Sequence, residues 1–132
     1  MNRLLSLTAI IELGAGLALL AVPAVVVRLL LGGEISGAGI PLGRVAGTAL
    51  LALGVACWLV RGDAPGRAAK GLVAAMWVYN LGAVIVLGAA GLQLQPVGVA
   101  LWPAVILHAA MAVWCFECLR RKLPAEPIAT PT

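Results

Sequence analysis

Charged residues are scarce in this 132-residue chain. Asp, Glu, Lys and Arg make up 11% of it, against about 25% in globular proteins, while 63% is hydrophobic against about 45–50%. A water-soluble domain of this size has no need for apolar runs of roughly 20 residues, and several are present. The alternating strands of a membrane barrel are also missing, for example between Ala46 and Val60. Both classes are therefore excluded.

Catalytic motifs are absent as well. We find no nucleophile–base pair, no phosphate-binding glycine loop and no nucleotide-binding pattern. We therefore expect a protein that is not an enzyme and has no cofactor. The net charge of +4 needs no nucleic-acid partner, because the basic residues have a topological explanation.

Four apolar stretches dominate the chain, and each is long enough to cross about 30 Å of hydrocarbon as a helix. We predict an all-α integral membrane protein, an up-down bundle of four transmembrane helices joined by short connections. Residues 1–122 form one domain, and the proline-containing end 123–132 is expected to be a mobile cytoplasmic tail. The predicted helices are Leu4–Val27, Gly43–Val60, Leu72–Leu92 and Val97–Leu119.

Lys and Arg residues predict the orientation. Seven of the nine lie at the amino end, in the Arg61–Gly71 connection or after the fourth helix. The other two, Arg28 and Arg44, flank the Arg28–Leu42 connection. The positive-inside rule therefore predicts that both termini are cytoplasmic. The Arg28–Leu42 connection would lie outside, resting on headgroups or forming a lid.

Small residues line one side of the second predicted helix. Gly43 and Gly47 form a GxxxG pattern, and Gly54 continues it. Such a stripe allows close helix contacts. We expect contact within the bundle or, alternatively, pairing with a second copy of the chain.

Three predicted helices carry a polar residue at similar depth. Glu12 and Asn80 each lie about 12 Å from the inner ends of their helices, and His108 about 16 Å. Tyr79 adds a hydroxyl beside Asn80. A carboxyl costs about 2.5–3.5 kcal/mol or more in a helix centre, so Glu12 should face the bundle, a cavity or a partner. This layer is the predicted ligand- or proton-binding site.

Three interpretations of this layer remain open. The polar residues could satisfy one another and set helix register, because interhelical polar contacts contribute about 0.6 kcal/mol without any further role. They could bind a small polar or cationic ligand. A Glu12–His108 pair could instead relay a proton.

A soft-metal or thiol function is a further alternative. His108, Met111, Cys115 and Cys118 share one helix face, and their side chains are compatible with copper(I). The same spacing is ordinary for a packed helix, so we predict no metal. The Cys115–Cys118 CxxC pattern lies at a helix carboxyl end, where the dipole does not lower a thiol pKa.

Short motifs spread over nearly the whole chain carry a resemblance. Ile11-Glu12-Leu13-Gly14-x-Gly16-Leu17, Gly43-Arg44-x-x-Gly47, Tyr79-Asn80 and Leu101-Trp102-Pro103 through His108 resemble small uncharacterised bacterial membrane proteins of the broad DoxX-like type. The resemblance implies a bacterial cytoplasmic (inner) membrane. Glu12 alone also resembles the intramembrane Glu of small multidrug resistance transporters.

The predicted function is that of a non-enzymatic membrane protein, either an accessory or assembly factor or a small-ligand-binding bundle. Its partners would be the lipid bilayer, a small-molecule ligand, and a second copy or a larger membrane complex. The first alternative is a proton-coupled small-molecule exporter acting as a homodimer. The second is thiol or soft-metal handling.

Overall fold

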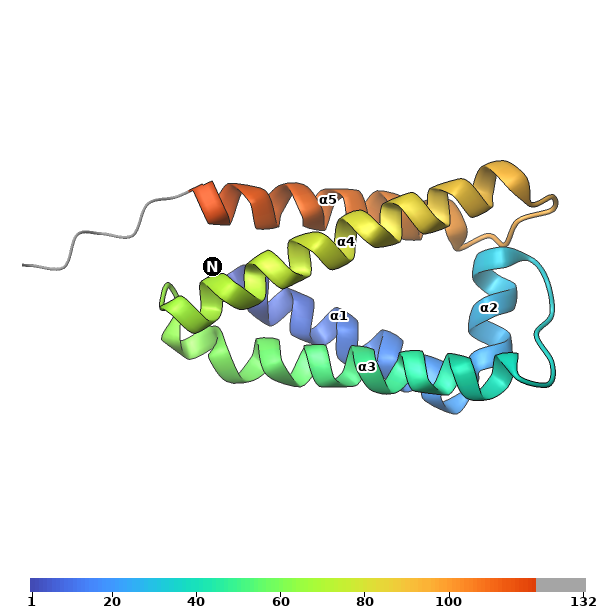
Figure 1. The fold of residues 1–132 in the computed structure, drawn as a ribbon, viewed down its shortest axis with the longest axis horizontal. Coiled ribbons are helices and arrows are strands. Elements are labelled where there is room, and N and C mark those ends of the chain that lie inside the picture. Colours follow the sequence, from blue (N-terminus) through green and yellow to red (C-terminus); the bar gives the residue numbers. More distant parts are fainter. Residues whose placement is uncertain (121–132) are drawn as a thin grey trace, which may run out of the picture.

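The computed structural model describes residues 1–120, and that part of the chain is helical without strands (Figure 1). Four of its helices are long and apolar enough to cross a membrane, which suggests a multi-pass membrane protein. The predicted tail 123–132 lies outside the described residues. The elements are α1 (Asn2–Ala21), α2 (Pro23–Leu31), α3 (Gly39–Val60), a 3₁₀ turn η1 (Arg61–Asp63), α4 (Arg67–Gln93) and α5 (Leu101–Arg120).

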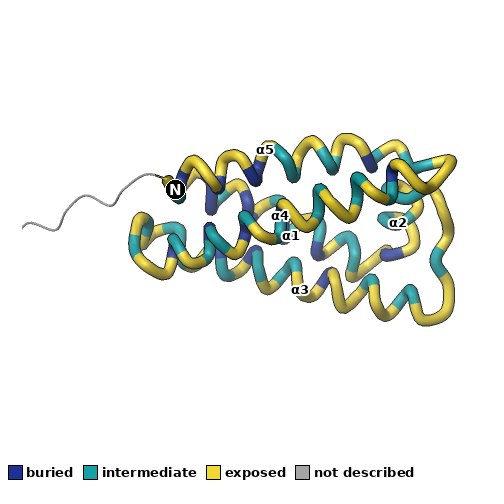
Figure 2. The backbone as a smooth tube through the Cα atoms, turned by 45° about the horizontal axis from the view of Figure 1, so that its top comes forward, coloured by how far each residue is buried: buried dark blue, intermediate teal, exposed yellow. Residues whose placement is uncertain are grey.

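The long helices form two pairs, α1 with α3 and α4 with α5. The pairs meet near the amino terminus and lie farther apart at the opposite end, where α2 stands across the gap (Figure 1). Most of the buried positions lie at the end where the pairs meet (Figure 2). The core there consists of Leu4, Leu5, Ala9, Cys57, Ala69, Val73, Met76, Met111, Cys115 and Cys118.

Glycines bring α1 and α3 into close contact. A Cβ on Gly16 would lie 2.7 Å from the carbonyl oxygen of Gly47, and one on Gly47 would lie 2.8 Å from that of Gly16. Gly54 packs against Leu13, and Gly43 against Pro23. The small-residue stripe predicted from the sequence is therefore occupied by α1 and α2 of the same chain.

The first predicted helix, Leu4–Val27, is wrong at its carboxyl end. Helix α1 stops at Ala21, and a separate helix begins at Pro23. Proline has no N–H to donate and disfavours helical backbone in the preceding residue, and Val22 accordingly leaves the helical conformation, with φ −134° and ψ 57°. Pro23 takes the first position of α2, where a missing N–H costs nothing.

Helix α2 is anchored to the segment before α5 by backbone hydrogen bonds. The N–H of Gly98 donates to the carbonyl of Leu30 at 3.2 Å, and that of Ala100 donates to the carbonyl of Leu29 at 2.9 Å. These bonds use carbonyls that the end of α2 leaves without helical partners. Helix α5 begins at Leu101, four residues after the predicted Val97. A Cβ on Gly98 would overlap the Leu29 carbonyl.

The remaining boundaries extend beyond the predicted ones. Helix α3 begins at Gly39, four residues before Gly43, and α4 begins at Arg67, five residues before Leu72. Both ends of the predicted Arg28–Leu42 connection are therefore helical, the first in α2 and the last in α3. The added residues of α4 include Arg67 and Lys70, which lie outside its apolar stretch.

The outer surface of the helices is apolar. Large hydrophobic side chains point outward along α1, α3, α4 and α5, as expected for helices surrounded by hydrocarbon. Trp58, Trp102 and Trp114 are among these exposed side chains.

The glycine contact between α1 and α3 predicts a contrast between two neighbouring substitutions. Gly16→Ala should destabilise the folded protein by about 1–3 kcal/mol, because the new methyl group meets the backbone of α3. Gly14→Ala should be neutral or slightly stabilising, because nothing lies within 4 Å of its Cβ position and alanine favours helix. Unfolding in detergent micelles measures both, and equal effects would contradict the packing described.

Candidate functional site

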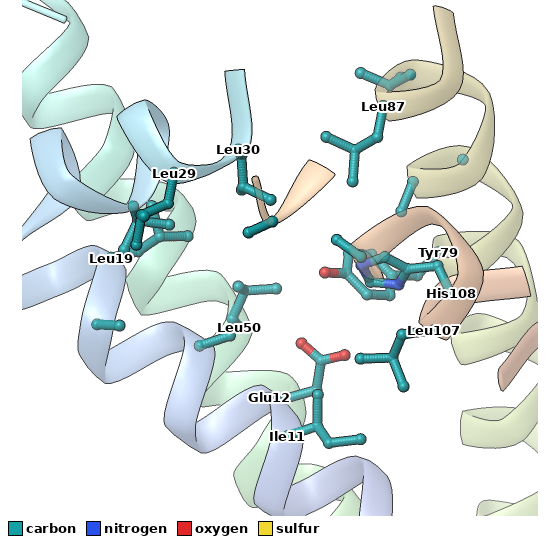
Figure 3. Close-up of a pocket in the computed structure, with 18 residues that line it drawn as sticks. Ile11, Glu12, Leu19, Leu29, Leu30, Leu50, Tyr79, Leu87, Leu107 and His108 are labelled. Carbon is teal, nitrogen blue, oxygen red and sulfur yellow. The ribbon is translucent and has the colours of Figure 1, made fainter. Parts of the chain in front are cut away.

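A partly open cavity of about 700 Å³ lies between the two helix pairs and beneath α2 (Figure 3). Its volume falls in the range of about 300–1,000 Å³ that is typical of small-molecule sites. Its lining is almost entirely aliphatic, with Glu12, Tyr79 and His108 as the exceptions. The aliphatic contribution comes from every long helix and from α2, and includes Leu19, Leu30, Leu50, Leu87, Ala104 and Leu107.

The predicted polar residues lie where the packed core ends and the cavity begins. Glu12 follows the core residue Ala9 on α1, and Asn80 follows Met76 on α4. His108 precedes Met111 on α5. Residues three or four apart share a helix face, so each polar side chain continues the core-facing side of its helix.

Glu12 is the charged residue of this cavity. The residue is only 4% exposed. Its carboxyl forms no hydrogen bond or ion pair with any residue between 1 and 120. Every fully buried side-chain polar atom in this range has a hydrogen-bond partner. Because the Glu12 carboxyl has none, its oxygens are not fully buried and border the cavity that Glu12 lines. Figure 3 shows the carboxyl extending from α1 into the open space.

Asn80 and His108 form a pair between α4 and α5. The Asn80 side-chain N–H donates to the carbonyl of Met76 at 2.7 Å, which turns its Oδ1 toward His108. His108 Nδ1 lies 2.8 Å from this oxygen. Since an amide oxygen only accepts, Nδ1 must carry a proton. In neutral His108, Nε2 is therefore left as an acceptor. Asn80, which is 2% exposed, determines this tautomer through its hydrogen bond to Nδ1.

Tyr79 completes the polar part of the cavity. Its ring meets the His108 ring edge-on, with centroids 5.6 Å apart. Its hydroxyl reaches the same open space as the Glu12 carboxyl, from the opposite helix pair (Figure 3). Tyr79 and Asn80 are neighbours on α4, and helical geometry turns one toward the cavity and the other toward His108.

The four residues considered for soft-metal binding are divided between two environments. Met111, Cys115 and Cys118 are buried in the core with Cys57, whereas His108 lines the cavity. Within residues 1–120, no group of three or more His, Cys, Asp or Glu side chains is arranged to hold a metal ion. The three cysteines are free thiols.

The other charged side chains between residues 1 and 120 do not line the cavity. Arg28 and Glu34 both border a small surface pocket outside α2, but no ion pair joins them within the described residues. Glu117 and Arg120 form an exposed pair at 3.4 Å near the end of α5. Exposed pairs of this kind contribute at most about 1 kcal/mol. None of these residues supplies a cation to Glu12.

The sequence reasoning missed the part of the site formed by α2. Val26, Leu29 and Leu30 form a wall of the cavity, although these residues were assigned to a helix end and an outer connection. The signal was present in Pro23, which marks the break before α2. Nothing in the sequence indicated that α2 would turn across the bundle.

No family model, curated protein or solved structure matches this chain. Its functional assignment therefore depends on the geometry of the cavity.

The Asn80–His108 hydrogen bond makes a spectroscopic prediction. His108 is the single histidine of the chain, so its ring nitrogens can be assigned without ambiguity. In the neutral state, ¹⁵N shifts should report a proton on Nδ1, and Asn80→Leu should abolish this preference because the acceptor is removed. Asn80→Asp keeps an acceptor oxygen and should retain it. A proton on Nε2 in the unaltered protein would contradict the arrangement.

Proposed function

We propose that this protein is a non-enzymatic membrane protein that binds a small, largely apolar molecule in the cavity between its helix pairs. The unpartnered carboxyl of Glu12 facing an aliphatic cavity carries the proposal. A ligand of this kind fills the apolar volume and offers one polar group to Glu12, Tyr79 and His108. Such a ligand would be held by two kinds of contact, apolar contacts with the cavity wall and a polar contact with these three side chains.

A purely structural role explains less of the arrangement. Polar residues that only set helix register would satisfy one another. Asn80 and His108 do so, but Glu12 has no partner within the described residues. Its carboxyl faces space large enough for a ligand, and placing a polar group there is costly without a partner.

The proposed setting is the cytoplasmic membrane of a bacterium, as the DoxX-like resemblance implies. We propose that the four long helices cross the bilayer up and down, with both termini on the cytoplasmic side. The excess of Lys and Arg at the amino end, around η1 and after α5 supports this orientation.

Proton-coupled export remains the second candidate. Glu12 supports it, because an unpaired intramembrane carboxyl can bind a proton or a substrate in turn. Binding in the cavity is common to this function and to an accessory role.

Ligand binding is tested by photolabelling with an aliphatic diazirine that carries a primary alcohol, applied to the protein in lipid nanodiscs. We expect labelled peptides from the cavity-facing parts of α1 and α5, because the probe fills the cavity and its hydroxyl reaches the polar residues. Gly82→Leu should lower this labelling several-fold, since Gly82 lines the cavity and its Cβ position is open.

Gly88→Leu is the matched control for this experiment. Gly88 lies on the same helix with an equally open Cβ position, but it does not line the cavity. Its labelling should stay at the level of the unaltered protein. Labelling spread evenly over the lipid-facing surfaces, or equal effects of the two variants, would remove the proposal.

The orientation is tested with reporter fusions at the carboxyl terminus and in the Gly32–Ala38 connection. Green fluorescent protein at the carboxyl terminus should fluoresce, and alkaline phosphatase there should be inactive, because the end lies in the cytoplasm. Alkaline phosphatase in the connection should be active. The reversed pattern would overturn the proposed topology.

A further inference from the structure

We infer that the ligand of this cavity is a lipophilic amine, bound as its ammonium ion with the N–H groups directed at Glu12, Tyr79 and His108. This inference rests on the proposed ligand-binding function and specifies the chemistry of the polar end. It follows from the kinds of polar atoms that line the cavity and from the positions of the basic residues.

The cavity is rich in acceptors. The Glu12 carboxylate and the free Nε2 of His108 accept hydrogen bonds, and the Tyr79 oxygen can accept as well. The Asn80 contact matters here, because it places the His108 proton on Nδ1 and leaves the acceptor nitrogen for the cavity. A ligand that only accepts, such as a ketone, would leave His108 Nε2 without a partner.

Glu12 has no cationic partner among residues 1–120. In this part of the chain no Lys or Arg lines the cavity, and the basic residue of α2, Arg28, borders a separate surface pocket. A carboxylate in apolar surroundings is costly unless it takes up a proton or a charge of opposite sign accompanies it. An ammonium ion supplies that charge together with as many as three donors, which matches the three polar residues.

The aliphatic lining describes the rest of the molecule. The rest of the lining consists of aliphatic side chains from all four long helices and α2. They offer dispersion contacts and no further hydrogen bonds. The ligand therefore has one polar end and an apolar body. The Tyr79 ring gives the ammonium an aromatic neighbour as well.

The test is competition against the diazirine alcohol by four compounds that are built on the same unbranched eight-carbon chain. Octylamine should compete best, because it brings both charge and donors. Octyltrimethylammonium keeps the charge without N–H donors, 1-octanol keeps one donor without charge, and 2-octanone offers acceptors only. We expect octylamine to compete about 10- to 100-fold better than 2-octanone, as a charged hydrogen bond would give.

Glu12→Gln provides the matched variant, since it removes the charge and keeps the size. It should reduce the advantage of octylamine to within a few-fold of 1-octanol while the cavity is still labelled. His108→Leu should lower octylamine competition less, because an acceptor is lost but the charge remains. The ranking of the four compounds on the unaltered protein already tests the amine inference, even if one of these variants fails to fold.

The possible outcomes separate the two proposals. Cavity labelling without any preference for octylamine would overturn the amine inference and leave the binding function standing. Preference for octyltrimethylammonium over octylamine would also overturn it, because donors would then contribute nothing. Loss of all cavity-specific labelling would remove the binding function itself.

Discussion

The break between α1 and α2 is the constraint on which the rest of the structure depends. Pro23 ends the first long helix and starts a short one that stands across the bundle (Figure 1). Backbone hydrogen bonds from Gly98 and Ala100 then hold the end of α2 against the start of α5. A continuous first helix would leave the space between the pairs without its α2 wall.

The two halves of the bundle consequently have different properties. Where the pairs meet, large apolar and sulfur-containing side chains fill the interior. Toward α2 the interior is a cavity. Glu12 and His108 lie where one half changes into the other, so a bound molecule would contact polar groups at one end of an otherwise aliphatic space. This arrangement orients an amphipathic ligand through ordinary burial and hydrogen bonding.

Much of the fold follows from local properties of the sequence. The four long helices are predicted because about 20 consecutive apolar residues form one stable structure in hydrocarbon, in which the backbone satisfies its own hydrogen bonds. The polar residues were also identifiable, because Glu12, Asn80 and His108 stand out within apolar helices. The end of α1 was predictable from Pro23, but the hydropathy of Val25–Val27 concealed it.

Other features required the positions of distant segments. The spacing along each helix does not reveal that Asn80 pairs with His108 while Glu12 has no partner among residues 1–120. This depends on how far the helix pairs diverge. The role of α2 as a cavity wall likewise depends on Gly98, which lies 66 positions after Gly32. The amino-acid sequence by itself determined the helical class, the four long apolar stretches and the chemistry available in them, since these are local consequences of hydropathy. Only the tertiary structure decided which polar groups satisfy one another and which face open space, because that is set by packing between helices.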